Sequence, residues 1–122
     1  MFGAKRRRFE MLVLQSIEEL EEEETYGVPL QKHLSEVIGR HVYFGELYAA
    51  LIRVREKKLI LSWAVPGGKK RGYRRKQLHA LTGEGRVLLK EWQSTPEASE
   101  LPSPGMIQRM REATRSLFHR AH

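Results

Sequence analysis

Residues 65–77 read VPGGKKRGYRRKQ, and this stretch decides how the rest of the chain is interpreted. Six of the eight residues in its KKRGYRRK segment are Lys or Arg, and glycines precede and interrupt the run. Extended, β-prone runs flank the stretch at residues 60–65 and 73–81. Because Gly and Pro favour turns, we predict a β-hairpin whose tip lies at residues 67–72.

Three amphipathic helices are predicted ahead of this hairpin, because apolar residues recur there at three- and four-residue spacing. The first helix spans residues 8–22. The second is short; it starts near Thr25 or Gly27 and ends at Gly39, which suits the left-handed residue that often follows a helix. The third spans residues 44–57 and has one buried face and one free face.

The chain after the hairpin divides into a helix, a linker and a second helix. The helix is predicted over residues 83–92, with Thr82 as its N-cap. Its inward-facing side chains are expected to be Val87, Leu88 and Trp92. Residues 93–105 contain three of the five prolines and three serines, which is typical of a linker. Residues 106–122 resume a helical pattern. The apolar seam of this last helix is Ile107, Met110, Thr114 and Leu117.

Three helices followed by a hairpin make a winged helix, which is a variant of the helix-turn-helix. We therefore predict a mainly α fold with a small β-hairpin, in which residues 1–92 form a winged helix-turn-helix domain. In that arrangement the helix over residues 44–57 enters the DNA major groove. The hairpin, the wing over residues 67–76, then lies along the phosphates or in the adjacent minor groove.

The distribution of charge agrees with a polyanionic partner. Fourteen basic and five acidic residues lie between positions 25 and 92, so this part carries a net charge of +9, while the whole chain carries +7. Cations in the wing would neutralise phosphates and release condensed counterions. The predicted wing contacts are Lys69, Lys70, Arg71, Arg74, Arg75 and Lys76.

The third helix supplies the predicted contacts to the bases. Tyr43, Phe44 and Glu46 stand at its N-terminal end, and Ala49 and Arg53 are assigned to the same free face. Arg53 either contacts guanine through two hydrogen bonds or is a surface residue without such a role. Glu46 either accepts a hydrogen bond from cytosine or simply favours the start of the helix, and we prefer the second interpretation.

The first helix has a second apolar face, formed by Met11 and Leu14, which lie off its main stripe. A helix of a small monomer should be polar there, so this face indicates that something else covers it. A helix as short as residues 106–122 is marginal alone, and it is the obvious candidate for that cover. Its basic outer face could also meet the acidic run Glu18–Glu24 of another subunit.

Several function classes are excluded or disfavoured by the residue inventory. The chain has no cysteine, and its five histidines form no known ligand spacing, so we expect neither a metal site nor a cofactor. No apolar run approaches the roughly 18 residues needed to cross a bilayer, and the basic start lacks a signal-peptide core. We also find no phosphate loop and no nucleophile with a nearby base. We therefore expect a cytoplasmic protein that is not an enzyme and has no membrane partner.

Five segments stand in a fixed order along residues 10–89: EMLVLQSIEEL, TYGVPLQKHLSEVIGR, FGELYAALIRVREKKLI, GGKKRGYRRK and LHALTGEGRVLL. Within them are the pair Tyr26-Gly27, the string Gly45-x-Leu47-Tyr48-x-x-Leu51 and the string Leu81-Thr82-x-x-Gly85. In this order they resemble the PadR family of bacterial transcriptional regulators in its short-chain form. The resemblance covers about two-thirds of the chain.

The chain departs from the family pattern at three places. Lys58 stands where the family usually has Gly, so this lysine is expected to adopt the left-handed conformation at a cost near 1 kcal/mol. His79 stands where the family usually has Tyr in the second wing strand. The linker over residues 93–105 replaces part of the long final helix that is common in the family, and this bears on how the protein dimerises.

The resemblance implies a homodimeric repressor or regulator that binds an inverted-repeat operator. Family dimers join through their first and last helices, which assigns dimerisation to Met11, Leu14, Ile107, Met110, Thr114 and Leu117. Tyr48 matches a family position at the DNA-facing border, where it either reaches a phosphate or packs in the core. Trp92 is similar to a position that binds a flat aromatic effector between subunits, or it is ordinary core packing. The alternative function is a winged-helix module that binds another protein or RNA.

Overall fold

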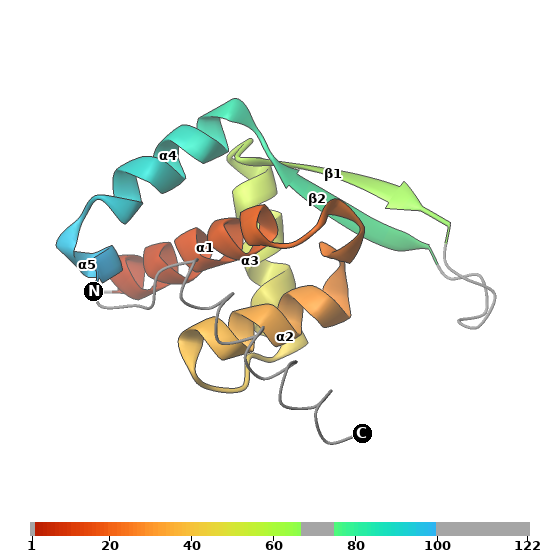
Figure 1. Ribbon diagram of the computed structural model, residues 1–122, viewed down its shortest axis with the longest axis horizontal. Helices are drawn as coiled ribbons and strands as arrows, with labels where there is room; N and C mark the ends of the chain where they lie inside the picture. The colour runs from red at the N-terminus through yellow and green to blue at the C-terminus, as the bar shows by residue number, and fades with distance from the viewer. Residues whose placement is uncertain (1, 67–74, 100–122) are drawn as a thin grey trace, which may run out of the picture.

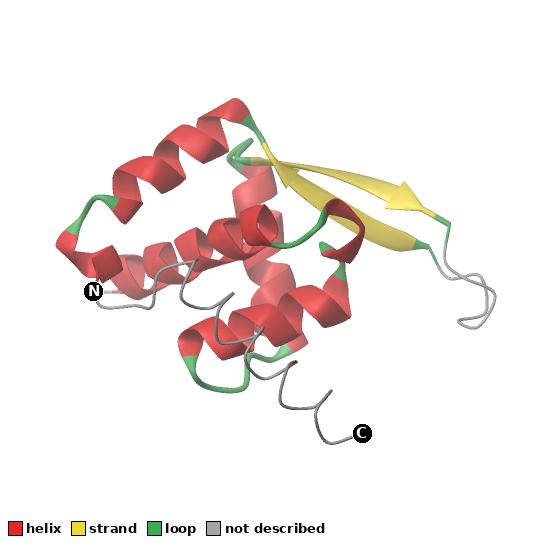
Figure 2. Cartoon of the chain, viewed as in Figure 1, coloured by secondary structure: helices red, strands yellow, loops and turns green. Residues whose placement is uncertain are grey.

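The computed structural model describes residues 2–66 and 75–99 of the chain. The elements in chain order are α1 (Phe2–Glu19), the 3₁₀ turn η1 (Glu22–Glu24), α2 (Gly27–Ile38), α3 (Phe44–Glu56), β1 (Ile60–Val65), β2 (Lys76–Leu81), α4 (Gly83–Gln93) and α5 (Pro96–Ser99). Figure 2 shows that this part of the chain is mainly helical, with one antiparallel pair of strands after the third helix. The fold is a winged helix, as the order of the sequence patterns predicts.

Helix α1 is the centre of the domain, because α2, α3, α4 and strand β2 all pack against it. Every residue from Met11 to Ile17 is buried as a result. Met11 and Leu14 are at most 1% exposed and belong to the core. The prediction that they form an open second face for dimerisation is therefore wrong, since their own chain already covers them.

The turn between α3 and β1 depends on Lys58, whose φ of 61° is the left-handed conformation predicted for it. Thr82, which directly follows β2, lies beside this turn and binds it by two hydrogen bonds. Its hydroxyl donates to the Lys58 carbonyl (2.8 Å), and its backbone N–H donates to the Leu59 carbonyl (3.0 Å). The same hydroxyl accepts from the Gly85 N–H (3.0 Å), so Thr82 is the N-cap of α4, as predicted.

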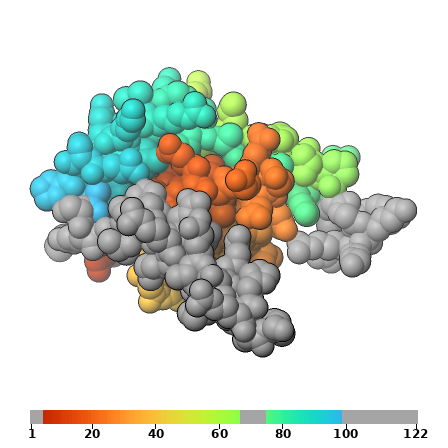
Figure 3. Space-filling view, in the orientation of Figure 1, coloured from red at the N-terminus to blue at the C-terminus, as the bar shows by residue number. Residues whose placement is uncertain are grey.

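The hairpin has a regular register, from Ile60 opposite Leu81 to Val65 opposite Lys76. In Figures 1 and 3 the two strands project from one side of the helical body, away from α4 and α5. Strand β2 packs on α1 and η1, which attaches the base of the hairpin to the core. The hairpin is thus an arm that starts beside α3.

The end of α2 agrees with the sequence patterns, whereas both ends of α1 differ from them. Gly39 ends α2 with a φ of 83°, as expected for a left-handed glycine after a helix. Helix α1 begins at Phe2 and ends at Glu19, both earlier than the predicted range of 8–22. None of the helices in residues 2–66 and 75–99 is long and apolar enough to cross a membrane.

The C-terminal part differs from the prediction in two respects. The described start of the predicted linker is not irregular: α4 continues to Gln93, and residues 96–99 form the short helix α5, whose Ala98 packs on the core. Val87 is exposed instead of facing inward, because Gly85, Leu89 and Trp92 supply the buried side of α4. The predicted helix over residues 106–122 lies outside the described residues.

We predict that Gly85→Ala destabilises the domain by about 2–3 kcal/mol, as overpacking of a fixed backbone does. A Cβ at this position would overlap the carbonyl oxygen of Leu59, which the turn holds in place. Gly83, two residues earlier in the same helix, faces open space. The matched variant Gly83→Ala should therefore leave stability unchanged or raise it by up to about 1 kcal/mol. Urea unfolding of both variants is the measurement, and equal stabilities would contradict the close packing of α4 on the turn.

Candidate nucleic-acid interface

The solvent-facing side of α3 is centred on Gly45, Ile52 and Glu56, opposite the buried Leu47 and Val54. The sequence analysis assigned Ala49 and Arg53 to this free face, so its predicted centre lay closer to Arg53. The difference arises because α1 and the hairpin flank α3 on its two sides, so the open side lies between them. Most of this surface is apolar: Tyr48 is 50% exposed and Ile52 is 47% exposed.

A groove runs between α3, the start of α2 and the hairpin, and we call it the wing groove. Its cations are Arg55 of α3 and Arg75 and Lys76 of the hairpin. No carboxylate is among the described residues that line it. Its volume of about 1220 Å³ exceeds the roughly 300–1,000 Å³ of a small-molecule pocket. The groove therefore suits a large anionic ligand that extends along the surface. Its apolar lining is Tyr26, Val28, Phe44, Tyr48, Leu51 and Ile52.

Lys76 is oriented within this groove by an aromatic ring. Its Nζ lies 4.3 Å from the centroid of the Tyr26 ring, which is a cation–π distance. Tyr26 is the N-cap residue of α2, so the contact connects the end of the hairpin to the helix-turn-helix. The other predicted wing cations, Lys69, Lys70, Arg71 and Arg74, lie outside the described residues.

A smaller groove of about 410 Å³ lies on the other side of the free face of α3, and we call it the N-terminal groove. Lys5 and Arg6 of α1 line it together with Ala49 and Arg53 of α3. The sequence interpretation missed Lys5 and Arg6 as candidates. The basic run at residues 5–8 was a signal, but only the packing of α1 against α3 shows that it stands beside the free face.

Arg53 is not free, because it is bound to a buried carboxylate. Its Nε donates to Oε1 of Glu10 at 2.8 Å, and Nζ of Lys57 donates to Oε2 of Glu10, also at 2.8 Å. The Glu10 side chain is only 3% exposed. Burial raises the pKa of Glu10, but the hydrogen bonds from Lys57 and Arg53 outweigh it and hold the pKa below its ordinary value. Arg53 therefore lies at the edge of the free face instead of at its centre, and its Nε is already bound to Glu10.

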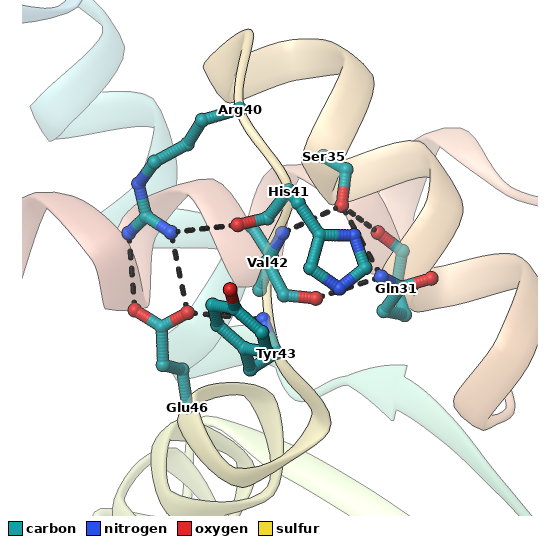
Figure 4. A network of polar contacts seen from close by, with 7 residues as sticks. All are labelled: Gln31, Ser35, Arg40, His41, Val42, Tyr43 and Glu46. Atoms are coloured by element: carbon teal, nitrogen blue, oxygen red, sulfur yellow. Dashed lines mark hydrogen bonds and ion pairs between the residues drawn. The ribbon is translucent and has the colours of Figure 1, made fainter.

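Glu46 is also engaged within the chain. Both of its oxygens accept from the Arg40 guanidinium, at 3.1 and 3.2 Å, and one of them accepts from the Tyr43 N–H at 3.0 Å (Figure 4). The Arg40 hydrogen bonds, followed by the one from Tyr43, lower the pKa of Glu46. Glu46 thus stabilises the start of α3, which agrees with the preferred of its two interpretations.

The turn between α2 and α3 is tied to α2 by two polar side chains (Figure 4). The Ser35 hydroxyl accepts from the Val42 N–H at 3.0 Å, and the Gln31 amide donates to the Val42 carbonyl at 2.7 Å. Val42 itself is fully buried. These contacts fix the angle between the two helices, which decides how α3 is presented.

Three aromatic side chains mark the N-terminal end of α3. Tyr43 is exposed, and Phe44 stacks on Tyr48 with ring centroids 5.8 Å apart. A Cβ at Gly27 would lie 2.8 Å from the Tyr48 hydroxyl, so this hydroxyl reaches the start of α2. Because Tyr48 is half-exposed, the alternative that it packs in the core is wrong. Trp92, in contrast, is buried in the core, which agrees with ordinary packing.

His79 is a buried residue beneath the hairpin. Its Nδ1 lies 2.7 Å from the Ser62 hydroxyl on the facing strand, and its backbone N–H donates to the Thr25 hydroxyl at 2.9 Å. Desolvation lowers the pKa of His79 to about 4, and the charge of Arg55 contributes in the same direction.

Within residues 2–66 and 75–99, no three His, Cys, Asp or Glu residues are grouped so that they could hold a metal ion.

We predict that Glu10→Gln lowers the free energy of unfolding by about 2 kcal/mol, because charge-assisted hydrogen bonds to two α3 cations are lost. Glu18→Gln, on an exposed site of the same helix, should change stability by less than about 0.5 kcal/mol. The contribution of Glu10 is fully present above its ordinary pKa of 4.5 and is lost as the pH falls below it. Denaturant unfolding at neutral and acidic pH measures both effects. Equal losses in the two variants would show that the Glu10 contacts contribute nothing.

We predict a second pH dependence from His79. The unfolded histidine takes up a proton near pH 6.5, but the folded one does so only near pH 4. Stability is therefore fully present above pH 6.5 and falls by up to about 3 kcal/mol between pH 6.5 and pH 4. The variant His79→Gln should lose this slope, whereas His41→Gln, at an exposed position, should keep it. Urea unfolding across this pH range is the test, and an unchanged slope in His79→Gln would refute it.

Comparison with known proteins connects this geometry to a group of regulators. No protein-family model matches the chain, and no curated protein matches its sequence. Solved structures do match its fold. A PadR family transcriptional regulator from Eggerthella lenta is 24% identical with a TM-score of 0.57, and the match covers 97% of this chain and 88% of that one.

Two further structures give the same result. A PadR-like transcription factor from Bacteroides fragilis is 22% identical with a TM-score of 0.56, and the match covers 96% of this chain and 99% of that one. A transcriptional regulator from Clostridium thermocellum is 19% identical with a TM-score of 0.61, covering 82% and 90%. Two of these three structures are described as PadR or PadR-like regulators and the third as a transcriptional regulator, and this chain shares their fold over most of its length.

Proposed function

We propose that this protein is a cytoplasmic, sequence-specific DNA-binding regulator of transcription, related to the PadR family. The observation that carries the proposal is that the free face of α3 and the hairpin cations Arg75 and Lys76 line one groove. A double helix seated there meets both at once: α3 in the major groove and the hairpin on the backbone.

The charge around α3 supports a duplex as the ligand. Arg55, Arg75 and Lys76 stand on the hairpin side of its free face, and Lys5 and Arg6 stand on the α1 side. A helix is about 10–12 Å across with its side chains, and the major groove is about 12 Å wide. Cations on both sides of an inserted helix are positioned for the two phosphate strands that border the groove.

The predicted wing residues extend this surface. In the sequence, Lys69, Lys70, Arg71 and Arg74 stand between the end of β1 and the start of β2. We assign them to the phosphates or the adjacent minor groove. Each phosphate that they neutralise would add to affinity without adding sequence preference.

We further propose that the protein acts as a homodimeric repressor on an inverted-repeat operator. Support comes from the resemblance of residues 10–89 to the PadR family and from structural neighbours of that description. Because Met11 and Leu14 are buried within their own chain, we assign dimerisation to residues 106–122 alone, with the seam Ile107, Met110, Thr114 and Leu117.

The experiment is selection of bound fragments from random duplex DNA, followed by titration of the selected site. We expect a two-fold symmetric consensus. The double variant Arg75→Gln, Lys76→Gln should bind all sequences more weakly and reduce the slope of log K against log salt by about 2. Arg86→Gln, Lys90→Gln removes the same charge from exposed positions of α4 and should leave the slope unchanged.

Each outcome bears on a separate part of the proposal. Absence of binding to any duplex would overturn it and favour a module that binds protein or RNA. Equal slopes for the two double variants would show that general basicity, and not the wing groove, attracts the DNA. A consensus without two-fold symmetry would exclude the inverted repeat but leave DNA binding in place.

A further inference from the structure

We infer that α3 recognises thymine methyl groups, so that the operator places A·T base pairs opposite the middle of this helix. The inference rests on the proposed function and deepens it. Its basis is the chemistry of the side chains that α3 leaves free once the ion pairs within the domain are taken into account.

The polar residues expected to contact bases are already committed elsewhere. Glu46 accepts from the Arg40 guanidinium and from the Tyr43 N–H at the start of α3. Arg53 donates through Nε to the buried carboxylate of Glu10. A base contact through Glu46 would disrupt its ion pair with Arg40, whereas Arg53 keeps the N–H groups of its two Nη atoms while its Nε holds Glu10. Hydrogen-bond recognition of bases by these two residues is therefore limited to the Nη groups of Arg53, at the edge of the free face.

The side chains that remain on the free face are apolar along the first two turns and beyond. Tyr48, Ala49 and Ile52 are exposed there, and Phe44 stacks behind Tyr48. Ile52 is half-exposed in the middle of the helix, although the exposed side of a surface helix is ordinarily polar. A single exposed aliphatic residue is ordinary, but Ile52 lines the wing groove together with Phe44 and Tyr48, and a contiguous apolar patch rimmed by polar residues marks a binding surface.

Thymine offers the apolar group that such a surface can contact. Each base pair presents a distinct pattern in the major groove, and the C5 methyl of thymine is its apolar member. The apolar stripe is also flanked by Arg55, Arg75 and Lys76, with no carboxylate among the described residues that line the wing groove. This positive charge favours a polyanion over a protein as the ligand that covers the apolar stripe. Arg55 and Glu56 stand at the C-terminal end of α3, whereas base contacts come mainly from the N-terminal part of such a helix.

The test replaces thymines of the selected operator with deoxyuridine, which removes only the methyl group and preserves pairing. We expect each replacement opposite α3 to weaken binding about fourfold, the equivalent of one buried methyl group. Thymines in flanking DNA outside the selected operator serve as the control, and their replacement should leave the affinity unchanged. Binding is measured by titration of the full chain at fixed salt.

A variant assigns the effect to the protein side chain. Ile52→Ala should bind the thymine operator more weakly and lose little further affinity when its partner thymine becomes uracil. Val87→Ala trims an equally exposed aliphatic residue of α4, outside both grooves, and should respond to uracil as the natural sequence does. Because both sites are exposed, thermal unfolding should confirm that each variant is folded.

The failures of the two proposals are distinguishable. If no duplex binds, the proposed function fails. If a selected operator binds but uracil has no effect at any position, the methyl inference is overturned while the function stands. If uracil weakens Ile52→Ala as much as the natural sequence, the methyl contact does not involve Ile52, and the assignment to the free face of α3 is wrong.

Discussion

The orientation of α3 depends on the carboxylate of Glu10. This group is buried on α1 and binds Arg53 of α3 and Lys57, the residue that caps the C-terminal end of α3. A buried carboxylate is costly unless it is paired, so the contact favours the rotation of α3 that keeps both cations beside Glu10, the same rotation that buries Leu47 and Val54. That rotation turns Tyr48 and Ile52 outward and Leu47 and Val54 into the core. Which side chains of α3 face outward thus depends on apolar burial together with an acidic residue on a different helix.

A second constraint positions the hairpin relative to α3. Lys58 takes the left-handed conformation between α3 and β1, and Thr82 binds the backbone of this turn on one side and caps α4 on the other. Because one threonine serves both ends of the hairpin, the strands and α3 are joined as one unit. The cation–π contact of Lys76 with Tyr26 adds a connection near the other end. The wing groove follows from this arrangement, and so does its positive charge.

These features account for a surface that combines apolar contact with positive charge. The ion pairs of Glu10 and Glu46 consume hydrogen-bonding groups to hold α3 in place. What remains outward is aromatic and aliphatic in the middle and cationic at both sides, with Glu56 at the C-terminal end of the helix. Such a division suits a ligand with a charged backbone and small apolar groups in its groove, which is the chemistry of duplex DNA.

The sequence by itself determined the order of the elements and several of their ends. Gly39 and Thr82 could be assigned because their roles depend on local backbone conformation, which neighbouring residues reveal. The left-handed Lys58 was expected from the resemblance to the PadR family, which usually has Gly at this position. The roles of Arg53, Met11 and Val87 were decided only by the tertiary structure. Each depends on an element that is distant in the sequence and packs beside it, and periodicity within one helix carries no information about that neighbour.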